Sequence, residues 1–442
     1  MKNELKRDSN FLLEWTDGEG KIFEAVFAEE YIKKRPMRCI HGRLFTVDGM
    51  IEDEGAIKNE IYESIKDYVQ TNLAKRVSSI LQSIKIAAYS EPFPTQTDRI
   101  HVSNGTLFTD GRFTEEKEFC MNRLPVIYST EAKEPIVWLK FLSQLLHDDD
   151  ILTLQEYFGY LLLPVTKAQK MLLMVGKGGE GKSRVGLVLR TIFGPNMYTG
   201  SIQKIETSKF ARADLEYMLV MVDDDMKMEA LPQTNHIKSI VTLEDKIDIE
   251  RKGQQSVQGE LYVRFICFGN GGLHALYDKS DGFYRRQLLL TTKDKPEDRE
   301  DDPFLIDKLK QERDGIFLWA FEGLRRLLKN HYQFTVSSQA KQNLEDAKEE
   351  GNNILAFMKS TGYIRFEKGK SMKSTDLYSA YESWCDANLE KPRASSSFLH
   401  YIRENQKKYG IIYDEKCINN HRGFHNICRE EWKTYTGPTP FD

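Results

Sequence analysis

The chain has 442 residues, of which 40% are hydrophobic, 11% are aromatic and 29% are charged, and its formal net charge is −4. This length predicts two or three domains with well-formed hydrophobic cores. The nearly balanced charge excludes a uniformly basic nucleic-acid coat, so any contact with DNA has to come from local basic patches.

The six cysteines are scattered without a C-x-x-C pair, which indicates reduced thiols in a cytosolic protein. The first residues lack the apolar segment of a signal peptide. No apolar run approaches the ~20 residues that cross a bilayer. We therefore expect a protein of the cytoplasm without a membrane partner.

Residues 1–125 are predicted to form a mixed α/β domain. Short β-like runs occur at 22–27 and 43–47. Apolar residues at three- and four-residue spacings predict a helical stretch over 59–88. The segment 100–108 is typical of a β-hairpin, because an Asn-Gly turn lies at its centre.

A helical collar is predicted over residues 126–164. One apolar helical stripe begins at Pro135 and a second runs over 152–163. Pro164 ends the second stripe, because proline lacks the N–H that a helix interior requires.

An α/β ATPase domain is predicted next, over 165–345. Its charged segment 293–303 is expected to be a solvated loop, and helices are expected over 304–331. The polar run 349–353 is expected to separate this domain from a last one at 352–442.

One glycine-rich stretch fits the phosphate-loop pattern G-x-x-x-x-G-K-[ST]: Gly176, Lys177, Gly178, Gly179, Glu180, Gly181, Lys182 and Ser183. Residues 170–175 predict a buried strand before it, and 184–193 predict a helix after it, so phosphate would meet a helix N-terminus. Lys182 is expected to reach the β- and γ-phosphates, and the Ser183 hydroxyl is expected to bind Mg²⁺. The stretch predicts a site for ATP or GTP.

Consecutive acids follow a second apolar strand, predicted over 218–222. We assign Asp223 to the metal ion and Asp224 to polarisation of the attacking water. Three acids in a row leave the register open, and Asp224 with Asp225 is the alternative.

Two later features suit chemistry at the γ-phosphate. A strand predicted over 262–268 leads to Asn270, whose amide can sense the nucleotide and position water. Arg285 and Arg286 follow, and an arginine from a neighbouring subunit can stabilise charge at the γ-phosphate. The sequence does not separate these two arginines.

A basic hairpin is predicted between the acids and Asn270. Ile247 and Ile249 alternate as in a strand, and Arg251-Lys252-Gly253 follows as the turn. In a ring such a hairpin would enter the pore and bind a DNA backbone. A solvated basic turn is the alternative.

The order of these motifs is similar to that of superfamily 3 helicases. More narrowly, the chain resembles the helicase portion of poxvirus- and phage-type primase–helicases, such as the replication initiators of phages and staphylococcal pathogenicity islands. Stretches at 154–160, 309–324 and 377–385 carry this resemblance further. It covers residues 100–442 well and the first 100 residues loosely.

The resemblance implies an AAA+ core that uses ATP and Mg²⁺, a homo-oligomeric ring that is typically a hexamer, and translocation on single-stranded DNA, usually 3′→5′. The family commonly has Asn where this chain has Glu180, so we expect altered loop contacts with binding retained. Residues 1–100 lack an acidic constellation suited to priming, and we expect priming to be absent or carried by a separate primase. A phage or pathogenicity-island origin would place the protein in the bacterial cytoplasm.

The last domain, 352–442, is predicted to order three helices before a hairpin, as a winged-helix domain does. It has 14 Lys/Arg against 11 Asp/Glu, which gives +3, opposite in sign to the whole chain. Arg403 and Lys407 lie on the polar face of the third helix, 397–409, and are the candidates for contact with origin DNA.

Four further residues have side chains suited to zinc, but their spacings are not those of a zinc finger. They are Cys417, His421, His425 and Cys428. The segment 419–423 is expected to be a hairpin turn instead.

Three functions remain open. The leading one is an ATP-dependent DNA helicase of the replication-initiator type. The first alternative is an origin-binding or loading AAA+ ATPase without processive unwinding, and the second is a switch or packaging ATPase. The basic hairpin favours the motor over the switch.

Overall fold

The computed structural model describes residues 14–17, 21–69, 71–226, 234–243, 246–253, 255–270, 281–295 and 302–430. Predictions for residues 1–13, for the glycines after Asn270 and for 296–301 of the charged loop lie outside these ranges. The described chain divides into two compact units. Unit 1 holds the described residues up to 226, then 234–270 and 285–340, and unit 2 holds 281–284 and 341–430.

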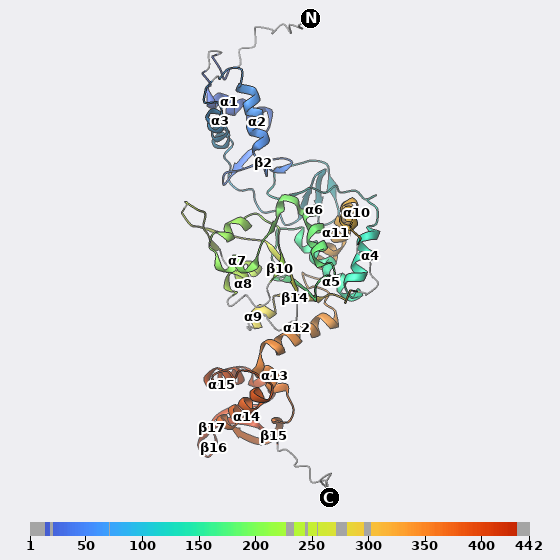
Figure 1. Ribbon diagram of the computed structural model, residues 1–442, viewed down its shortest axis with the longest axis vertical. Coiled ribbons are helices and arrows are strands. Elements are labelled where there is room, and N and C mark those ends of the chain that lie inside the picture. Colours follow the sequence, from blue (N-terminus) through green and yellow to red (C-terminus); the bar gives the residue numbers. More distant parts are fainter. Residues whose placement is uncertain are drawn as a thin grey trace. The chain divides into compact units, whose positions relative to one another are not determined.

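Unit 1 begins with three helices and a small antiparallel sheet of order β1-β2-β3 (Figure 1). The elements are α1 (Glu24–Lys34), β1 (Arg38–Ile40), β2 (Arg43–Thr46), β3 (Gly49–Met50), α2 (Gly55–Ile65) and α3 (Leu73–Ala87). Their apolar side chains form a cluster of their own, in which Ile61 and Ile80 are fully buried. The strand expected over 43–47 is confirmed as β2.

The strand predicted over 22–27 is wrong, because α1 begins at Glu24. Phe27 is buried and Tyr31, four residues later, packs against the same cluster, so the apolar spacing continues with the helical period. The helical stretch predicted over 59–88 is divided into α2 and α3. Asn72 takes a left-handed conformation with φ 55° directly before α3, where asparagine is tolerated better than most residues.

The next part joins a four-stranded sheet of order β6-β5-β4-β7 to two helices. These elements are β4 (Arg99–Val102), β5 (Gly105–Phe108), β6 (Phe113–Thr114), β7 (Arg123–Leu124), α4 (Ile136–Leu145) and α5 (Asp148–Leu161). The hairpin predicted at 100–108 is confirmed as β4 and β5. The two collar helices are likewise present as α4 and α5.

The remaining elements of unit 1 form the nucleotide-binding core of the sequence prediction. They are β8 (Met171–Gly176), α6 (Lys182–Phe193), the 3₁₀ helix η1 (Gly194–Asn196), β9 (Met197–Thr199), α7 (Ile202–Thr207), the 3₁₀ helix η2 (Ala211–Leu215), β10 (Val220–Met226), α8 (Asn235–Thr242), β11 (Ile247–Ile249), β12 (Val257–Gly259), β13 (Arg264–Asn270), β14 (Gln287–Thr291), α10 (Leu305–Gln311) and α11 (Arg313–Lys329).

Five strands of this core make a parallel sheet of order β14-β8-β13-β10-β9. In Figure 1, α4, α5, α6, α10 and α11 lie to one side of β10, and α7 and α8 lie to the other. Helices on both sides explain why these strands are nearly continuous apolar runs. The carboxyl ends of the parallel strands meet at one edge, where α/β proteins bind their ligands.

Close backbone packing holds α5 against α11. A Cβ atom on Gly159 would lie 2.2 Å from the Leu324 nitrogen, so only glycine fits there. The fully buried Glu156 carboxylate accepts a hydrogen bond of 2.6 Å from Arg326 Nε of α11.

Unit 2 combines helices with an antiparallel sheet of order β15-β17-β16. Its elements are α9 (Asp281–Tyr284), the end of α12 (Ser338–Gly351), α13 (Asn353–Lys359), β15 (Ile364–Lys373), α14 (Ser374–Ala387), α15 (Ser395–Glu404), α16 (Gln406–Tyr409), β16 (Ile412–Ile418) and β17 (His421–Arg429). Helix α12 ends at Gly351, within the polar run 349–353 that was predicted to separate the domains, whereas the compact units divide after Ala340.

The predicted helix order of unit 2 is observed, but β15 was missed. This strand lies at the sheet edge, and within it Ile364 and Met372 are buried while most of the charged residues between them are exposed. Its alternation is therefore too weak to indicate a strand. Tyr381 and Phe398 stack at 4.5 Å in the core of the unit. No helix in the described part of the chain is long and apolar enough to cross a membrane.

Candidate nucleotide-binding site

The glycine-rich loop connects the end of β8 to the start of α6 at Lys182. Gly178, Gly179 and Gly181 have φ values of +111°, +84° and +112°. Residues with a Cβ adopt this region at a cost, whereas glycine does not. The loop thus has the conformation that brings its backbone to the N-terminus of a twelve-residue helix, where anions bind.

A cavity of about 300 Å³ opens beside this loop. Residues from four separate chain segments line it: Gly178, Gly179, Glu180, Gly181, Lys182, Ser183, Arg184, Asp224, Asn270, Asp302 and Leu305. Its volume lies at the small end of the range for small-molecule sites. The structure therefore brings together four residues that the sequence singled out separately, namely Lys182, Ser183, Asp224 and Asn270.

Glu180 and Lys182 form a buried ion pair at this cavity. The Lys182 ammonium donates to Glu180 Oε2 at 2.8 Å, and their side chains are only 6% and 3% exposed. The Gly178 N–H donates to the other oxygen, Oε1, at 2.7 Å. Burial alone would raise the pKa of Glu180, but the hydrogen bonds from Lys182 and from the backbone outweigh it and lower the pKa.

The three acids of β10 point to different places. Asp223 is buried and its Oδ2 accepts a hydrogen bond of 2.7 Å from the Ile202 N–H, at the start of α7. Burial raises the pKa of Asp223. Asp224 lines the cavity, whereas Asp223 does not. Of the three acids considered for the metal and the water, Asp224 is thus the one that the structure places at the cavity.

Asn270 lies beside the loop because of the strand register. It is the last residue of β13 and pairs with Gly176, the last residue of β8. An amide at this place faces the cavity that Lys182 also lines. Ser183 and Asp224, which both line the cavity, supply the hard oxygen donors that Mg²⁺ prefers.

Two cavity residues were missed from the sequence. Asp302 and Leu305 come from the start of α10, and Asp302 also pairs with Lys308 at 2.7 Å. Asp302 belongs to the charged segment predicted as a solvated loop and Leu305 to the stretch predicted as helical, and no local pattern places either of them over the glycine loop. Lys177, in contrast, is 80% exposed and pairs with Asp294 at 2.9 Å outside the cavity.

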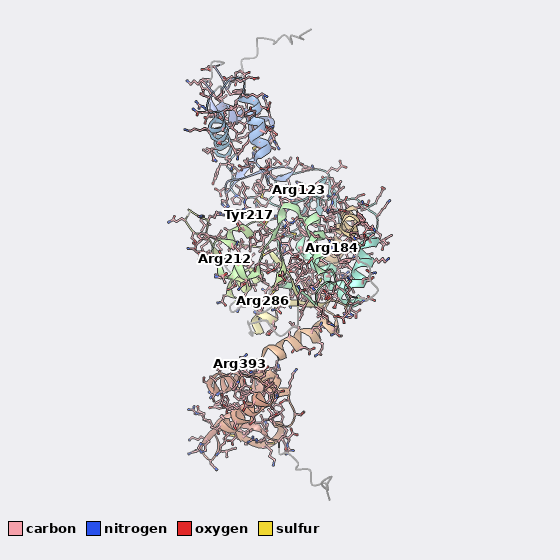
Figure 2. All side chains as sticks on the ribbon, viewed as in Figure 1. Arg123, Arg184, Arg212, Tyr217, Arg286 and Arg393 are labelled. Atoms are coloured by element: carbon pink, nitrogen blue, oxygen red, sulfur yellow. The ribbon has the colours of Figure 1, made fainter. Side chains whose placement is uncertain are left out.

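The arginine pair lies at the opposite edge of the sheet. β14 starts at Gln287, whose register partner is Met171, the first residue of β8. Five strand residues of about 3.3 Å each therefore separate the arginines from the loop of their own chain. Arg285 is exposed and Arg286 is 8% exposed. Figure 2 shows Arg286 well apart from Arg184, which lines the cavity.

The predicted basic hairpin is present as the antiparallel pair β11–β12. Arg251, at its turn, forms an ion pair with Glu216, and Glu216 also contacts His41 Nδ1 at 3.2 Å. Lys252 is exposed. The two neighbouring cations of the turn therefore differ: one is tied to the body of unit 1 and the other faces solvent.

Of the basic candidates in unit 2, Lys407 is exposed, whereas the Arg403 guanidinium lies over the Tyr413 ring at 4.2 Å. Of the four residues suited to zinc, Cys417 and His425 are in contact, with 3.7 Å between Sγ and Nδ1, but the four do not form one cluster. His425 also contacts Asp414 Oδ2 at 3.1 Å and Ser371 Oγ at 2.8 Å. No group of three or more potential metal ligands occurs among the residues that the structure describes.

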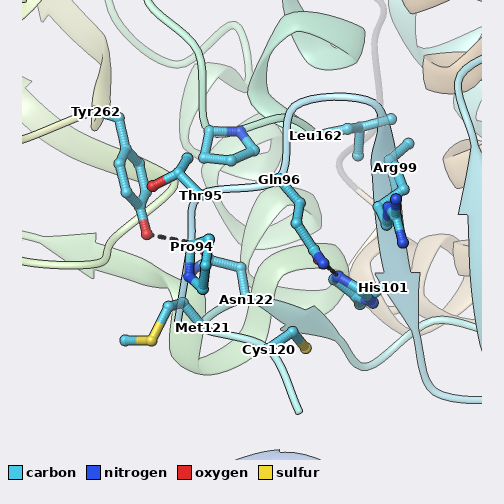
Figure 3. Close-up of a pocket in the computed structure, with 12 residues that line it drawn as sticks. Pro94, Thr95, Gln96, Arg99, His101, Cys120, Met121, Asn122, Leu162 and Tyr262 are labelled. Atoms are coloured by element: carbon cyan, nitrogen blue, oxygen red, sulfur yellow. Dashed lines mark hydrogen bonds between the residues drawn. The ribbon is translucent and has the colours of Figure 1, made fainter. Parts of the chain in front are cut away.

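A second, very small pocket lies away from the loop (Figure 3). Its volume is about 30 Å³, close to that of one water molecule. Tyr262 donates to Asn122 at 2.8 Å, and His101 contacts Gln96. Burial lowers the pKa of His101 to about 4, so this imidazole is neutral near pH 7. These features are those of a packed core rather than of a ligand site.

Comparisons with known proteins bear on the fold of this region. A family model described as a family of unknown function (DUF5906) matches residues 174–286, from the end of β8 to the arginine pair. No curated protein matches the chain. The apo structure of the NrS-1 C-terminal region (305–718) is similar, with a TM-score of 0.55 and 12% identity over 91% of this chain and 98% of that one. A second structure of that region, its A form, has a TM-score of 0.52 with the same identity and covers 91% and 100%.

Proposed function

We propose that this chain is an AAA+ ATPase of superfamily 3 that acts as an ATP-dependent DNA helicase of the replication-initiator type, in the cytoplasm of a bacterial host. The observation that carries this proposal is the single cavity lined by Lys182, Ser183, Asp224 and Asn270 at the carboxyl edge of a parallel sheet. The likeness in fold to the NrS-1 C-terminal region is consistent with it.

The residues present suit ATP with Mg²⁺. The positive-φ glycines allow the loop backbone to close around phosphate, and a bound Mg²⁺ would neutralise charge on the phosphates near Ser183 and Asp224. Lys182 supplies positive charge at the phosphates. Asn270, with Asp225 as a candidate beside Asp224, would orient the attacking water.

A neighbouring subunit completes the site in this proposal. Arg285 and Arg286 are a whole strand length from the loop of their own chain, so neither can reach a phosphate bound there. An arginine that acts at the γ-phosphate must then serve another copy. Arg285 is the better candidate because it is exposed while Arg286 is buried. This requirement supports a homo-oligomeric ring, for which a hexamer is the expected size.

DNA would be bound by two separate basic features. Lys252 on the exposed turn between β11 and β12 is placed to contact a single strand, since it lies at a hairpin tip. Lys407 and Arg403 in unit 2 are the candidates for origin DNA, with Lys407 the more exposed. A separate primase would provide primers where the system needs them. Movement in the 3′→5′ direction belongs to the same proposal.

A strand-displacement assay on a duplex with a 3′ single-stranded tail tests the proposal. The wild-type chain should release the displaced strand with ATP and Mg²⁺, and Lys182→Ala should not. A duplex with a 5′ tail is the control for polarity. ATP hydrolysis that is indifferent to DNA, with no strand released from either duplex, would exclude the motor.

One observation favours the second candidate, an origin-binding or loading ATPase without processive unwinding. Arg251 is tied to Glu216, so the hairpin turn presents less positive charge than its sequence indicates. A loader would remodel origin DNA in an ATP-dependent way, detectable by footprinting, without releasing a strand from the tailed duplex.

A further inference from the structure

The two oxygens of Glu180 engage two of the groups that a phosphate loop offers to its ligand. Oε1 accepts the Gly178 N–H at 2.7 Å, and Oε2 accepts the Lys182 ammonium at 2.8 Å. Backbone N–H groups of the loop and the lysine of the motif are the donors that hold nucleotide phosphates. A carboxylate with both oxygens bound in this way takes the place of an anionic phosphate group.

The buried position of the Glu180–Lys182 pair stabilises it, and a neighbouring glycine provides the space that it needs. The Lys182 side chain is 6% exposed, and a buried ammonium without a partner is costly. A Cβ atom on Gly176 would lie 2.8 Å from Glu180 Oε1 and 2.9 Å from Lys182 Nζ, so the glycine that opens the motif also makes room for the pair. Glu180 therefore provides the hydrogen-bond acceptor for the Gly178 N–H and the Lys182 ammonium when no phosphate is bound.

We propose that Glu180 is an internal competitor for the nucleotide, which must leave Lys182 and the Gly178 N–H before the phosphates can bind there. This inference rests on the proposed function, because it concerns nucleotide binding at the same loop. Both neighbours of Glu180 are glycines with positive φ, Gly179 and Gly181, which allow the loop backbone to turn the side chain out.

The competition has a quantitative consequence. Only the fraction of molecules with Glu180 displaced is competent to bind, so the apparent dissociation constant exceeds the intrinsic one by the inverse of that fraction. Glu180→Gln keeps the shape but removes the charge, and hydrogen bonds to a neutral amide are about half as strong. We expect Glu180→Gln to bind nucleotide about tenfold more tightly than the wild type.

The test is calorimetric titration of the full-length wild type and variants with MgADP and, separately, with inorganic pyrophosphate. The gain for Glu180→Gln should be the same for both probes, because pyrophosphate carries only the part of the nucleotide that Glu180 excludes. Glu180→Asp keeps the charge but is one methylene shorter. Its affinity for each probe should lie between those of the wild type and Glu180→Gln. If Glu180→Gln fails to fold, Glu180→Asp is the variant that tests the proposal.

Asp294→Asn is the matched control. It removes the same charge from a carboxylate that pairs with Lys177 of the same loop, but the two side chains are 74% and 80% exposed and lie outside the cavity. Exposed ion pairs contribute little, so its affinity should stay within about twofold of the wild type. An equal gain in Asp294→Asn and Glu180→Gln would show a general charge effect and overturn the competitor role.

Two results separate the failure of this inference from that of the proposed function. If the wild type binds MgADP, Lys182→Ala does not, and Glu180→Gln binds no more tightly than the wild type, the competitor role is overturned and the nucleotide site stands. If neither the wild type nor Glu180→Gln binds MgADP or pyrophosphate, both are overturned. Stopped-flow mixing with a fluorescent ADP adds a check: the association rate should level off at high concentration in the wild type, where displacement of Glu180 becomes limiting, and not in Glu180→Gln.

Discussion

Two cations that the sequence assigns to anionic ligands, Lys182 and Arg251, are each paired with a glutamate in the structure, but in different settings. Glu180 lies two residues from Lys182, within the same glycine loop and on the wall of the cavity. Glu216 lies 35 residues from Arg251, follows the helix η2 and also contacts His41. The Glu180–Lys182 pair can separate when the backbone of the short glycine loop changes conformation. The Arg251–Glu216 pair fastens a hairpin to the body of unit 1.

The difference shows what a motif does and does not specify. The glycine loop carries its counter-ion within its own sequence, so an anion from solution can replace that counter-ion without other changes. The counter-ion of Arg251 comes from elsewhere in the fold, and no local pattern indicates it. Of the two hairpin cations, Lys252 is therefore the one to which a DNA-binding role is best assigned.

The largest effect is expected at Lys182. Lys182→Ala should lower the ATP turnover number by about 10²–10³-fold or more, the cost of removing one preorganised charge donor at a transferring group. Lys310→Ala, at an exposed ion pair on α10, is the control and should change turnover by less than twofold. Steady-state ATP hydrolysis measures both, and comparable rates in Lys182→Ala and the wild type would remove the loop from the mechanism.

The next effect separates the neighbouring acids of β10. Asp224→Asn should lower turnover by about 10²-fold, because Asp224 lines the cavity. Asp223→Asn should keep turnover within a few-fold and instead cost about 1 kcal/mol of unfolding free energy, since it weakens a buried hydrogen bond to the start of α7. Urea unfolding together with ATP hydrolysis distinguishes them. The reverse pattern would restore Asp223 as the metal ligand.

A smaller effect sharpens the contrast at the hairpin. Lys252→Ala should reduce DNA-stimulated turnover more than basal turnover, and should lower the slope of log affinity for single-stranded DNA against log salt by about 0.7 per subunit. Arg251→Ala should leave that slope nearly unchanged and should lower the unfolding free energy by about 1–2 kcal/mol, because Glu216 loses its partner. Equal slopes in the two variants would contradict the distinction.

The smallest effect concerns pH. The pKa of Glu180 is lowered from its ordinary 4.5, so its carboxylate is charged throughout the range above that value. The stability that the pair contributes is present above pH 4.5 and is lost only as the pH falls through the lowered pKa. The ratio of MgADP affinities between Glu180→Gln and the wild type should therefore change by less than about twofold from pH 8 to pH 5.5. A ratio that falls toward one between pH 7 and pH 6 would place the pKa of Glu180 too high for this account.

The sequence predicts three of the five strands of the central sheet, because β8, β10 and β13 are buried runs that lead to residues of the site, and it misses β9 and β14. It fails where a partner comes from a distant segment. Asp302 and Leu305 reach the cavity only through the packing of α10 near α6. The direction of Asp223 depends on the N-terminus of α7, which no spacing within β10 reveals.

Short elements are the other source of error. Residues 22–27 contain residues that favour strands. The segment is nevertheless helical from Glu24, because α1 buries Phe27 in the hydrophobic core. β15 is missed because an edge strand buries few side chains. In each case tertiary packing outweighs the local preference of the residues.

The rate of ATP hydrolysis by the full-length chain with Mg²⁺, measured with and without single-stranded DNA, tests whether the glycine loop drives a DNA-dependent motor. We expect turnover that rises on addition of DNA and that falls by at least about 10²-fold in Lys182→Ala under both conditions. Comparable rates of hydrolysis in Lys182→Ala and the wild type, or a wild type without measurable hydrolysis under either condition, would contradict a nucleotide-driven role for the glycine loop.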